Sequence, residues 1–471
     1  MKKVLICSLL VLISLLCISA HAEQDGLYTY ELNDDMTVTI TGFDWANNHG
    51  DIYIPEMLGN RMVSAIGDNA FATTGNDAVS ITLPDGIKSI GALAFRGVAI
   101  KYVNIPLNTT QIGDGAFCQC PVMQFRVAEG HPVFATIDNA LYNKTEKKLI
   151  AWPENKEISP IPHGIKSIGG YVFYGRKIHE FDDISVEARF LPDTLTIIGP
   201  YAFAEGKFTG FLHNVSEIGE YAFFRSSPTY NENNPEVIFH DKELSLSKIG
   251  SHAFENNTLG FGNKKISSTP FEIGDYAFYN ALICWASTPD DPVSLCNVTS
   301  IGDYAFQSKE HNIYWIGFMP SDFSKLSFIG EGAFNNGSLS GSVDFASLKT
   351  ISSSAFATDK SSELTKLMEV STGEVTEISD KAFKGQSSLK NVQMNENLLS
   401  IGSEAFMGCT SLTEVSIPAS VNYIGDNVFA SCSDKLVIIV EAGSYGEVWA
   451  RTCGYAYKVN GKADDTSWLD D

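Results

Sequence analysis

The sequence predicts a repeat solenoid that is mainly β with short helical turns, and three observations carry this prediction. A six-residue motif, Ile-Gly-x-x-Ala-Phe, recurs along nearly the whole chain of 471 residues. Short strand-like segments precede the motif in its cleanest copies. The composition is 44% apolar, which can fill a large core. One such unit cannot bury its own apolar residues, so we expect about fourteen coils stacked on one another.

Fourteen copies of the motif are present, and their phenylalanines are Phe71, Phe95, Phe117, Phe173, Phe203, Phe223, Phe254, Phe278, Phe306, Phe334, Phe356, Phe383, Phe406 and Phe429. An Ile lies five residues before each Phe. Because buried Phe and Ile each contribute about 1.5–3 kcal/mol, we expect one stacked column of each. Gly follows the Ile in twelve copies, with Ser352 and Ser379 as exceptions. This Gly indicates a tight corner or a close backbone approach rather than a strict need for positive φ.

The segment before the motif ends in Pro in the cleanest units, at residues 80–84, 102–106 and 415–418. Its alternating apolar residues are typical of a strand with one buried face. Pro then ends the pairing, because it has no N–H for the next ladder bond. Each coil is therefore expected to run through a strand, a turn, an Ile-Gly corner and an Ala-Phe return.

The first residues, 1–22, have the pattern of a removable export signal. Lys2 and Lys3 precede an apolar run from Val4 to Ile18, and Ala20-His21-Ala22 resembles a cleavage site. The run is shorter than the ~20 residues that a membrane-spanning helix needs. We therefore expect a mature chain from Glu23 that is secreted or held at the cell surface, with no transmembrane segment after signal removal.

The motif, together with the segment Phe-Met-Gly-Cys-Thr-Ser-Leu-Thr-Glu-Val-Ser-Ile-Pro at 406–418, resembles the BspA-type leucine-rich repeats of bacterial surface proteins. The likeness covers residues 26–459 and implies a right-handed leucine-rich-repeat array. It also implies the domain organisation, which is an N-terminal capping hairpin and first coil at 23–65, a solenoid at 66–435 with a hairpin insertion near 130–157, a C-terminal cap at 436–459 and an acidic tail at 460–471.

The charge balance limits the kinds of partner. Lys and Arg number 33 against 56 Asp and Glu, which gives a formal net charge of −23. A field of this sign repels phosphate backbones and anionic lipids. We therefore expect no binding to nucleic acid or to a membrane surface.

No sequence pattern of a catalytic, cofactor-binding or metal site is present. The chain lacks a Gly-x-Ser-x-Gly elbow, a phosphate-binding glycine loop and a His-Glu-x-x-His pair among its nine histidines. Asn231–Asn234 and Asp290–Asp291 could offer oxygen ligands to calcium, but solvated loops explain them better. Cys118 and Cys120 have no second ligand pair beside them. We predict a protein that is not an enzyme and has no cofactor.

Cysteines are expected in two settings. Cys120, Cys409 and Cys432 each follow a motif Phe by three residues, so we expect small buried thiols, with a Cys409–Cys432 disulfide as the alternative. Cys284 and Cys296 lie in one insertion, where either a disulfide or two thiols would suit an exported protein.

The preferred function is an extracellular binding or adhesion protein that presents its repeat surface to host matrix proteins or other cells. Periodicity predicts the extended surface, and the family resemblance implies adhesion. The alternatives are a structural envelope or spacer protein and a secreted glycan-binding module. Trp152, Trp285 and Trp315 lie in long steps between motifs, where they are either binding anchors or packing residues. Aromatic side chains gathered on one open face would favour glycans, and a polar strand face with projecting loops would favour proteins.

Overall fold

The computed structural model describes residues 22–48, 50–73, 80–154, 159–179, 190–226, 237–239, 245–261, 266–285, 295–308, 316–318, 323–337, 339–359 and 366–460. The predicted export signal before Ala22 and the acidic tail after Asn460 lie outside these residues. The chain forms two compact units, Met1–Ser159 with Ile168–Val172 (unit 1) and Pro160–Ser167 with Phe173–Asp471 (unit 2).

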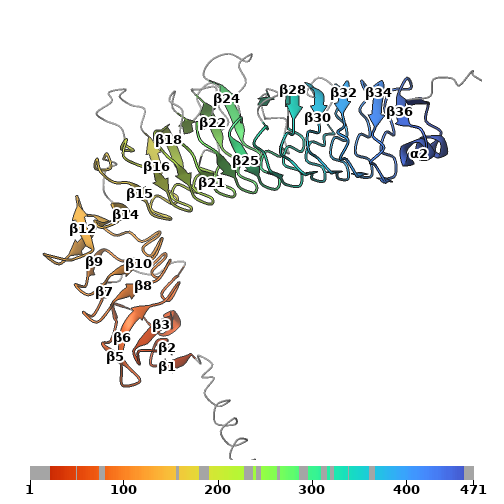
Figure 1. Ribbon diagram of the computed structural model, residues 1–471. Coiled ribbons are helices and arrows are strands. Elements are labelled where there is room, and N and C mark those ends of the chain that lie inside the picture. Colours follow the sequence, from red (N-terminus) through yellow and green to blue (C-terminus); the bar gives the residue numbers. More distant parts are fainter. Residues whose placement is uncertain are drawn as a thin grey trace, which may run out of the picture. The chain divides into compact units, whose positions relative to one another are not determined.

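Unit 1 begins with an antiparallel meander and continues as parallel coils (Figure 1). Its elements are β1 (Glu23–Asp25), β2 (Tyr28–Leu32), β3 (Val38–Phe43), η1 (Trp45–Asn47), β4 (Ile52–Tyr53), β5 (Met57–Leu58), β6 (Arg61–Ile66), β7 (Ile81–Thr82), β8 (Ser89–Ile90), β9 (Tyr102–Ile105), β10 (Gln111–Ile112), β11 (Gln124–Val127), β12 (Phe134–Ile137), β13 (Ala140–Asn143) and β14 (Lys148–Ala151). β12, β13 and β14 pair antiparallel, so a three-stranded meander interrupts the coils.

Unit 2 contains two rows of parallel strands. The short strands are β17 (Ile197–Ile198), β19 (Glu217–Ile218), β21 (Lys248–Ile249), β23 (Phe271–Ile273), β25 (Val298–Ile301), β27 (Phe328–Ile329), β29 (Thr350–Ile351), β31 (Glu377–Ile378), β33 (Ser400–Ile401) and β35 (Tyr423–Ile424). β15 (Ser167–Ile168) has one residue in each unit.

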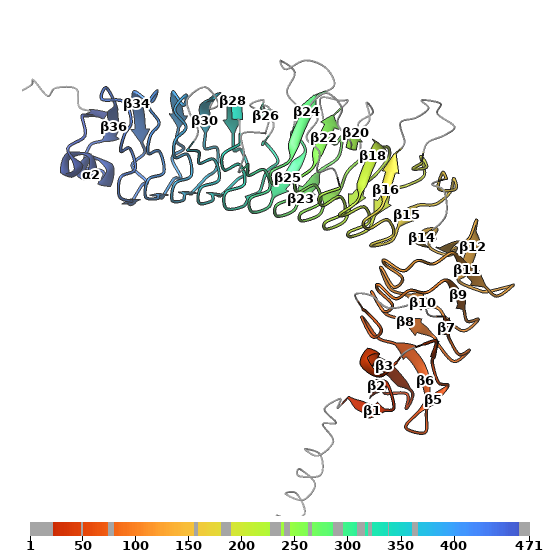
Figure 2. The same cartoon turned by 180° about the vertical axis from the view of Figure 1, so that it is seen from behind.

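The second row of unit 2 contains strands of three to six residues. They are β16 (Lys177–His179), β18 (Lys207–Leu212), β20 (Val237–Phe239), β22 (Thr258–Phe261), β24 (Leu282–Trp285), β26 (Ile316–Phe318), β28 (Leu339–Asp344), β30 (Lys366–Ser371), β32 (Asn391–Gln393), β34 (Glu414–Ile417) and β36 (Val437–Glu441). Helix α2 (Tyr445–Cys453) and β37 (Tyr457–Asn460) follow. Figures 1 and 2 show the two rows on opposite sides of unit 2.

The motif Ile residues lie in register in the short strands. Ile218, Ile249 and Ile273 are direct partners in successive parallel pairs, and each is buried. From Gly219 to Gly330, the motif Gly N–H then donates to the Ile carbonyl of the preceding coil, as from Gly250 to Ile218 at 2.8 Å. The predicted Ile column is therefore confirmed, and the backbone ladder fixes its register.

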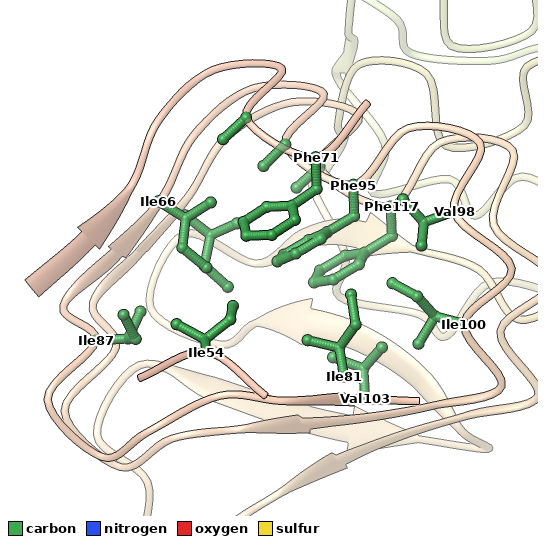
Figure 3. Packing of buried hydrophobic residues seen from close by; sticks show 14 of the residues in the cluster. Ile54, Ile66, Phe71, Ile81, Ile87, Phe95, Val98, Ile100, Val103 and Phe117 are labelled. Carbon is green, nitrogen blue, oxygen red and sulfur yellow. The ribbon is translucent and has the colours of Figure 1, made fainter. Parts of the chain in front are cut away.

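The motif phenylalanines stack inside each unit. In unit 2 the rings from Phe173 to Phe429 have centroids 4.9–5.5 Å apart and planes within 14° of parallel. In unit 1, Phe71, Phe95 and Phe117 stack at 5.2 and 5.6 Å, as Figure 3 shows. Every one of these side chains is buried. The Phe stacking predicted from the motif is confirmed, in a column of its own in each unit.

Other aromatic side chains close the columns. In unit 1, the Phe43 ring lies 5.1 Å from Phe71. In unit 2, Trp449 of α2 and Tyr455 meet the last ring, Phe429, edge-on at 6.1 and 6.2 Å. These contacts cover the terminal ring faces, which would otherwise face water.

The Gly after the Ile lies in close contact with the backbone of the preceding coil. A Cβ on Gly302 would lie 2.5 Å from the Asp275 backbone N, and one on Gly250 would lie 2.6 Å from the Glu220 backbone N. Neither glycine has a positive φ. The expectation of close backbone approach is therefore confirmed.

The repeat solenoid predicted from the motif is confirmed, with one correction to its turns. The Ala-Phe returns are hydrogen-bonded turns and not helical turns, and in the described residues the helices are η1 and α2. The reason is a left-handed residue two positions before every motif Phe, with φ between 53° and 66°, as at Asn69, Tyr304 and Gly115. A left-handed residue interrupts a right-handed helix.

Candidate binding surface

A second stack of aromatic rings runs along the outside of unit 2. It uses the motif position two residues before the Phe in five successive coils, and we call it the corner ladder, consisting of Tyr201, Tyr221, His252, Tyr276 and Tyr304. Ring centroids lie 4.6, 4.3, 4.9 and 5.2 Å apart in that order. All five side chains are half-buried. The ladder is therefore ordered by its own stacking while part of every ring remains accessible.

The backbone explains why this position points outward. Each ladder residue donates its N–H to the next coil, as Tyr221 does to Ser251 and Tyr276 does to Asp303 at 2.9 and 2.8 Å. The left-handed conformation turns that N–H along the array axis. For an L residue with a Cβ this conformation costs roughly 1–2 kcal/mol, and Gly or Asn adopts it most readily.

The fold itself does not require aromatic side chains at this position. Other coils place Asn69, Gly115, Lys381, Glu404 or Asn427 there, with the same positive φ. Asn and Gly would suit the backbone better than Tyr. Five successive aromatic residues therefore indicate a use for the side chains beyond forming the coil.

More aromatic surface lies beside the ladder. Phe224 and Tyr279 each follow a motif Phe and meet Tyr221 and Tyr276 edge-on at 5.4 and 5.3 Å. At the end of the ladder the Tyr304 ring lies over Gly332, where a Cβ would come within 2.5 Å of it. The aromatic surface is thus two residues wide in two of its coils.

Carboxylates border the ladder. Glu220, Asp275 and Asp303 each directly precede a ladder residue, and Glu331 precedes Gly332. Asp275 accepts the Asp303 backbone N–H at 2.8 Å, and Asp303 accepts the Glu331 backbone N–H at 2.7 Å. Both bonds use Oδ1, so each carboxylate is held in place with its second oxygen available.

The surroundings raise the pKa values of the ladder tyrosines. Burial is the main cause for Tyr221 and Tyr276, with a further contribution from nearby carboxylates. For Tyr304, a hydrogen bond to Glu331 is the largest cause, and its pKa rises to about 12. These phenols stay protonated at neutral pH. Tyr304 already donates its hydrogen bond to Glu331, and the hydroxyls of Tyr221 and Tyr276 can donate one to a partner.

The ring faces of the ladder are already in contact with one another. Tyr221, His252 and Tyr276 lie within 6° of parallel, so the imidazole is enclosed between two phenol rings. His252 Nδ1 also lies 2.5 Å from Glu255 Oε2. A flat apolar ligand or a cation would need an open π face, because the negative part of the ring quadrupole lies there. The ladder instead offers ring edges and hydroxyls.

The tryptophans do not form a binding face in the described residues. Trp152 is buried, with 4% of its surface exposed, so it is a packing residue. The Trp285 side chain and all of Trp315 lie outside the described residues, as do the acidic loops at 231–234 and 290–291. The sequence signal for the ladder is an aromatic residue at one variable motif position in consecutive copies.

The cysteines after the motif Phe act as hydrogen-bond donors. Cys120 Sγ lies 2.8 Å from the Phe95 carbonyl oxygen of the preceding coil, and Cys409 Sγ lies 3.4 Å from that of Phe383. Asn257 fills the equivalent position and donates to the Phe223 carbonyl at 2.5 Å.

Buried thiols are confirmed at Cys120 and Cys409, and Cys432 is half-buried. Cys409 and Cys432 are not joined by a disulfide. The Cys284 side chain lies outside the described residues, so the Cys284–Cys296 alternatives stay predictions. Burial raises the pKa of Cys120 to about 12 and that of Cys432 to about 11. Within the described part of the chain, no group of three or more His, Cys, Asp or Glu side chains could hold a metal ion.

Comparison with known proteins identifies the repeat. The family model of the BspA type leucine rich repeat region matches residues 64–182, 155–307, 230–363 and 299–436, which together cover more than half of the chain. No curated protein matches the sequence. Across the described residues, no helix is long and apolar enough to cross a membrane.

Several solved structures are similar at low identity. A leucine-rich repeat protein from Bacteroides ovatus is 18% identical with a TM-score of 0.38, over 93% of this chain and 100% of that one. A leucine rich cell surface protein from Faecalibacterium prausnitzii is 16% identical with a TM-score of 0.30, over 96% and 97%. The T. pallidum leucine rich repeat protein is 13% identical with a TM-score of 0.19, over 83% and 91%.

Proposed function

Because this chain belongs to the BspA-type leucine-rich repeat family, we propose that it is an extracellular, non-enzymatic binding protein whose repeat surface holds a protein partner. The observation that carries the proposal is the corner ladder. Five partly exposed aromatic side chains lie in line where the coil requires no aromatic residue.

Preorganisation favours binding at the ladder. Tyrosine offers a large contact area that is apolar along the ring and polar at the hydroxyl, and few of its torsions must be fixed on binding. Stacking between neighbours such as Tyr201 and Tyr221 already restricts those torsions in the free protein. Less conformational entropy is then lost when a partner docks.

The chemistry of the ladder supports binding rather than catalysis. A tyrosine acts as a nucleophile or base through its phenolate, and the raised pKa values of Tyr221, Tyr276 and Tyr304 disfavour that form. The hydroxyls are therefore suited to recognition by hydrogen bonds.

Protein partners fit the ladder better than glycans do. The test set by the sequence was whether aromatic side chains gather on one open face, and they do gather at this corner. Sugar rings, however, pack on open aromatic faces, and the faces of His252 and Tyr276 are covered by neighbouring rings. Peptide carbonyls can accept hydrogen bonds from the row of phenols. An adhesive role toward host matrix or other cells, after export through residues 1–22, belongs to the same proposal.

The test uses the mature chain, residues 23–471, on one array of extracellular-matrix proteins and one of glycans. The variant Y221N/Y276N should lose about tenfold or more in affinity for any captured protein. Y423N is the matched control, because Tyr423 is 52% exposed in the same unit but lies outside the ladder. The proposal would be overturned if the mature chain captured only glycans. It would also be overturned if Y221N/Y276N captured proteins as well as the unchanged chain does. Failure to bind either array would favour a spacer protein.

A further inference from the structure

The corner ladder lies in a strongly asymmetric charge environment. The motif segments from Gly199 to Gly337 contribute six carboxylates along this edge, which are Glu205, Glu220, Glu255, Asp275, Asp303 and Glu331. The basic residues of these same segments are Arg225 and His252. Arg225 is already engaged by Glu205 at 3.7 Å and by the Phe224 ring at 4.8 Å, and His252 lies against Glu255. Lys248 lies on the adjacent short strand. Negative charge therefore exceeds positive charge along the ladder.

Two of these carboxylates are fixed in place. One carboxylate oxygen of Asp275 and one of Asp303 each accept a hydrogen bond from a backbone N–H of the next coil. This bond orients the carboxylate without neutralising its charge, and the second oxygen has no bond within the described structure. Prefixed carboxylates lose less entropy on forming an ion pair than mobile ones do.

The aromatic rings define what can lie beside these charges. Their exposed edges give an apolar strip, along which the methylene stems of Lys or Arg can pack while the charged heads reach the carboxylates. Arg adds a planar fork that matches a carboxylate. Because the ring faces are closed, the charged heads would be held by the carboxylates and not by cation–π contacts.

Resting on the proposed function, we propose that the corner ladder docks an extended basic segment of the partner protein, rich in Arg or Lys, which runs along the array axis from coil to coil. The ladder has four steps of 4.3–5.2 Å. An extended peptide rises about 3.3 Å per residue, so roughly six residues cover the ladder.

The test measures fluorescence anisotropy of three labelled eight-residue peptides, alternating Arg-Ser, Lys-Ser and Glu-Ser, with the mature chain. The Arg and Lys peptides should bind and the Glu peptide should not. Binding should weaken as salt rises from about 50 to about 200 mM, because partly exposed charges are screened. Y276N should weaken Arg-peptide binding by about fivefold or more, since the apolar strip is lost with the ring.

The decisive comparison is between two charge-matched variants. D275N/D303N should weaken Arg-peptide binding by about tenfold or more. D380N/D426N removes the same charge at the same motif position, in coils without the ladder, where Asp380 also accepts a backbone N–H at 2.7 Å. This control should change binding by less than about twofold. Equal weakening by both variants would indicate a diffuse field and overturn the inference, as would no weakening by D275N/D303N.

The outcome for the basic segment can be separated from that for the proposed function. If Y221N/Y276N abolishes capture of a protein while D275N/D303N leaves that capture intact, the ladder is a binding site and the basic-segment inference is wrong. If neither variant changes capture, the ladder is not the site and both proposals fall. Circular dichroism of each variant confirms that the array remains folded.

Discussion

The Phe column and the corner ladder are two aromatic stacks in the same coils, and only one residue separates them in the sequence. Phe223 is buried, whereas Tyr221 remains half-exposed. Both stacks have nearly the same spacing, 5.0 Å from Phe203 to Phe223 and 4.6 Å from Tyr201 to Tyr221. The Phe position is aromatic in all fourteen motif copies, but the ladder position also accepts Asn, Lys and Glu. Burial therefore dictates the first stack, and some other requirement selected the second.

The largest expected difference between the two stacks is in stability. Phe306→Ala should lower the free energy of unfolding by ~3–5 kcal/mol, because it opens a cavity between two coils. Tyr304→Ala, in the same coil, should cost about 1 kcal/mol, since it loses one stacking partner and partial burial. Urea denaturation followed by circular dichroism measures both.

Phe306→Ala should also split the unfolding transition, because coils interact only with their neighbours. Small and equal losses for both variants would contradict the assignment of the core to the Phe column.

The carbonyls beside the Phe column provide a second test. Asn257→Leu removes two buried hydrogen bonds, one to the Phe223 carbonyl and one to the Ser226 hydroxyl, so we expect a loss of about 1–3 kcal/mol. Gln307→Leu, on the exterior next to the ladder, should change stability by less than about 0.5 kcal/mol. If thermal unfolding ranks them in the opposite order, these hydrogen bonds do not support the column.

The ladder should be important for binding and nearly neutral for stability. Tyr276→Asn loses stacking on two rings, worth roughly 0.5–1.5 kcal/mol each, but Asn fits the left-handed conformation better. We expect a net stability change within about 1 kcal/mol, together with the loss of binding proposed above. A loss of several kcal/mol measured by denaturation would mean that the ladder is a structural stack.

The smallest expected effect concerns thiol reactivity, which reports on the interior without perturbing it. Burial raises the pKa of Cys409 well above its usual value, so its thiolate is scarce at pH 8. Cys453 is exposed on α2. Iodoacetamide in excess at pH 8 should modify Cys453 and spare Cys120 and Cys409 until urea is added, as peptide mass spectrometry would show. Rapid alkylation of Cys409 in the folded protein would contradict its burial.

The raised pKa of Cys120 also predicts how its rate of alkylation changes with pH. Its pKa lies near 12, so alkylation of the folded protein should accelerate only as the pH rises toward that value. The variant C453S gives the background rate from the remaining thiols.

The sequence by itself determined the repeat, the inward direction of its Phe and Ile, and the close approach at the motif Gly. These follow from composition and period, because a short coil can bury such residues only against copies of itself. It also placed Cys120 and Cys409 in buried positions, since they follow a buried Phe at a fixed distance.

Only the tertiary structure decided the turn conformation and the ladder. The left-handed residue before each Ala-Phe pair is set by hydrogen bonds to the next coil, such as Tyr276 N–H to Asp303, and no residue type marks that requirement when Tyr, Lys and Glu all meet it. Neighbouring rings of the ladder are 20 to 31 residues apart in the chain, and Asp275 and Asp303 are 28 residues apart. Coil stacking brings them within about 5 Å of one another, because parallel neighbours share one register.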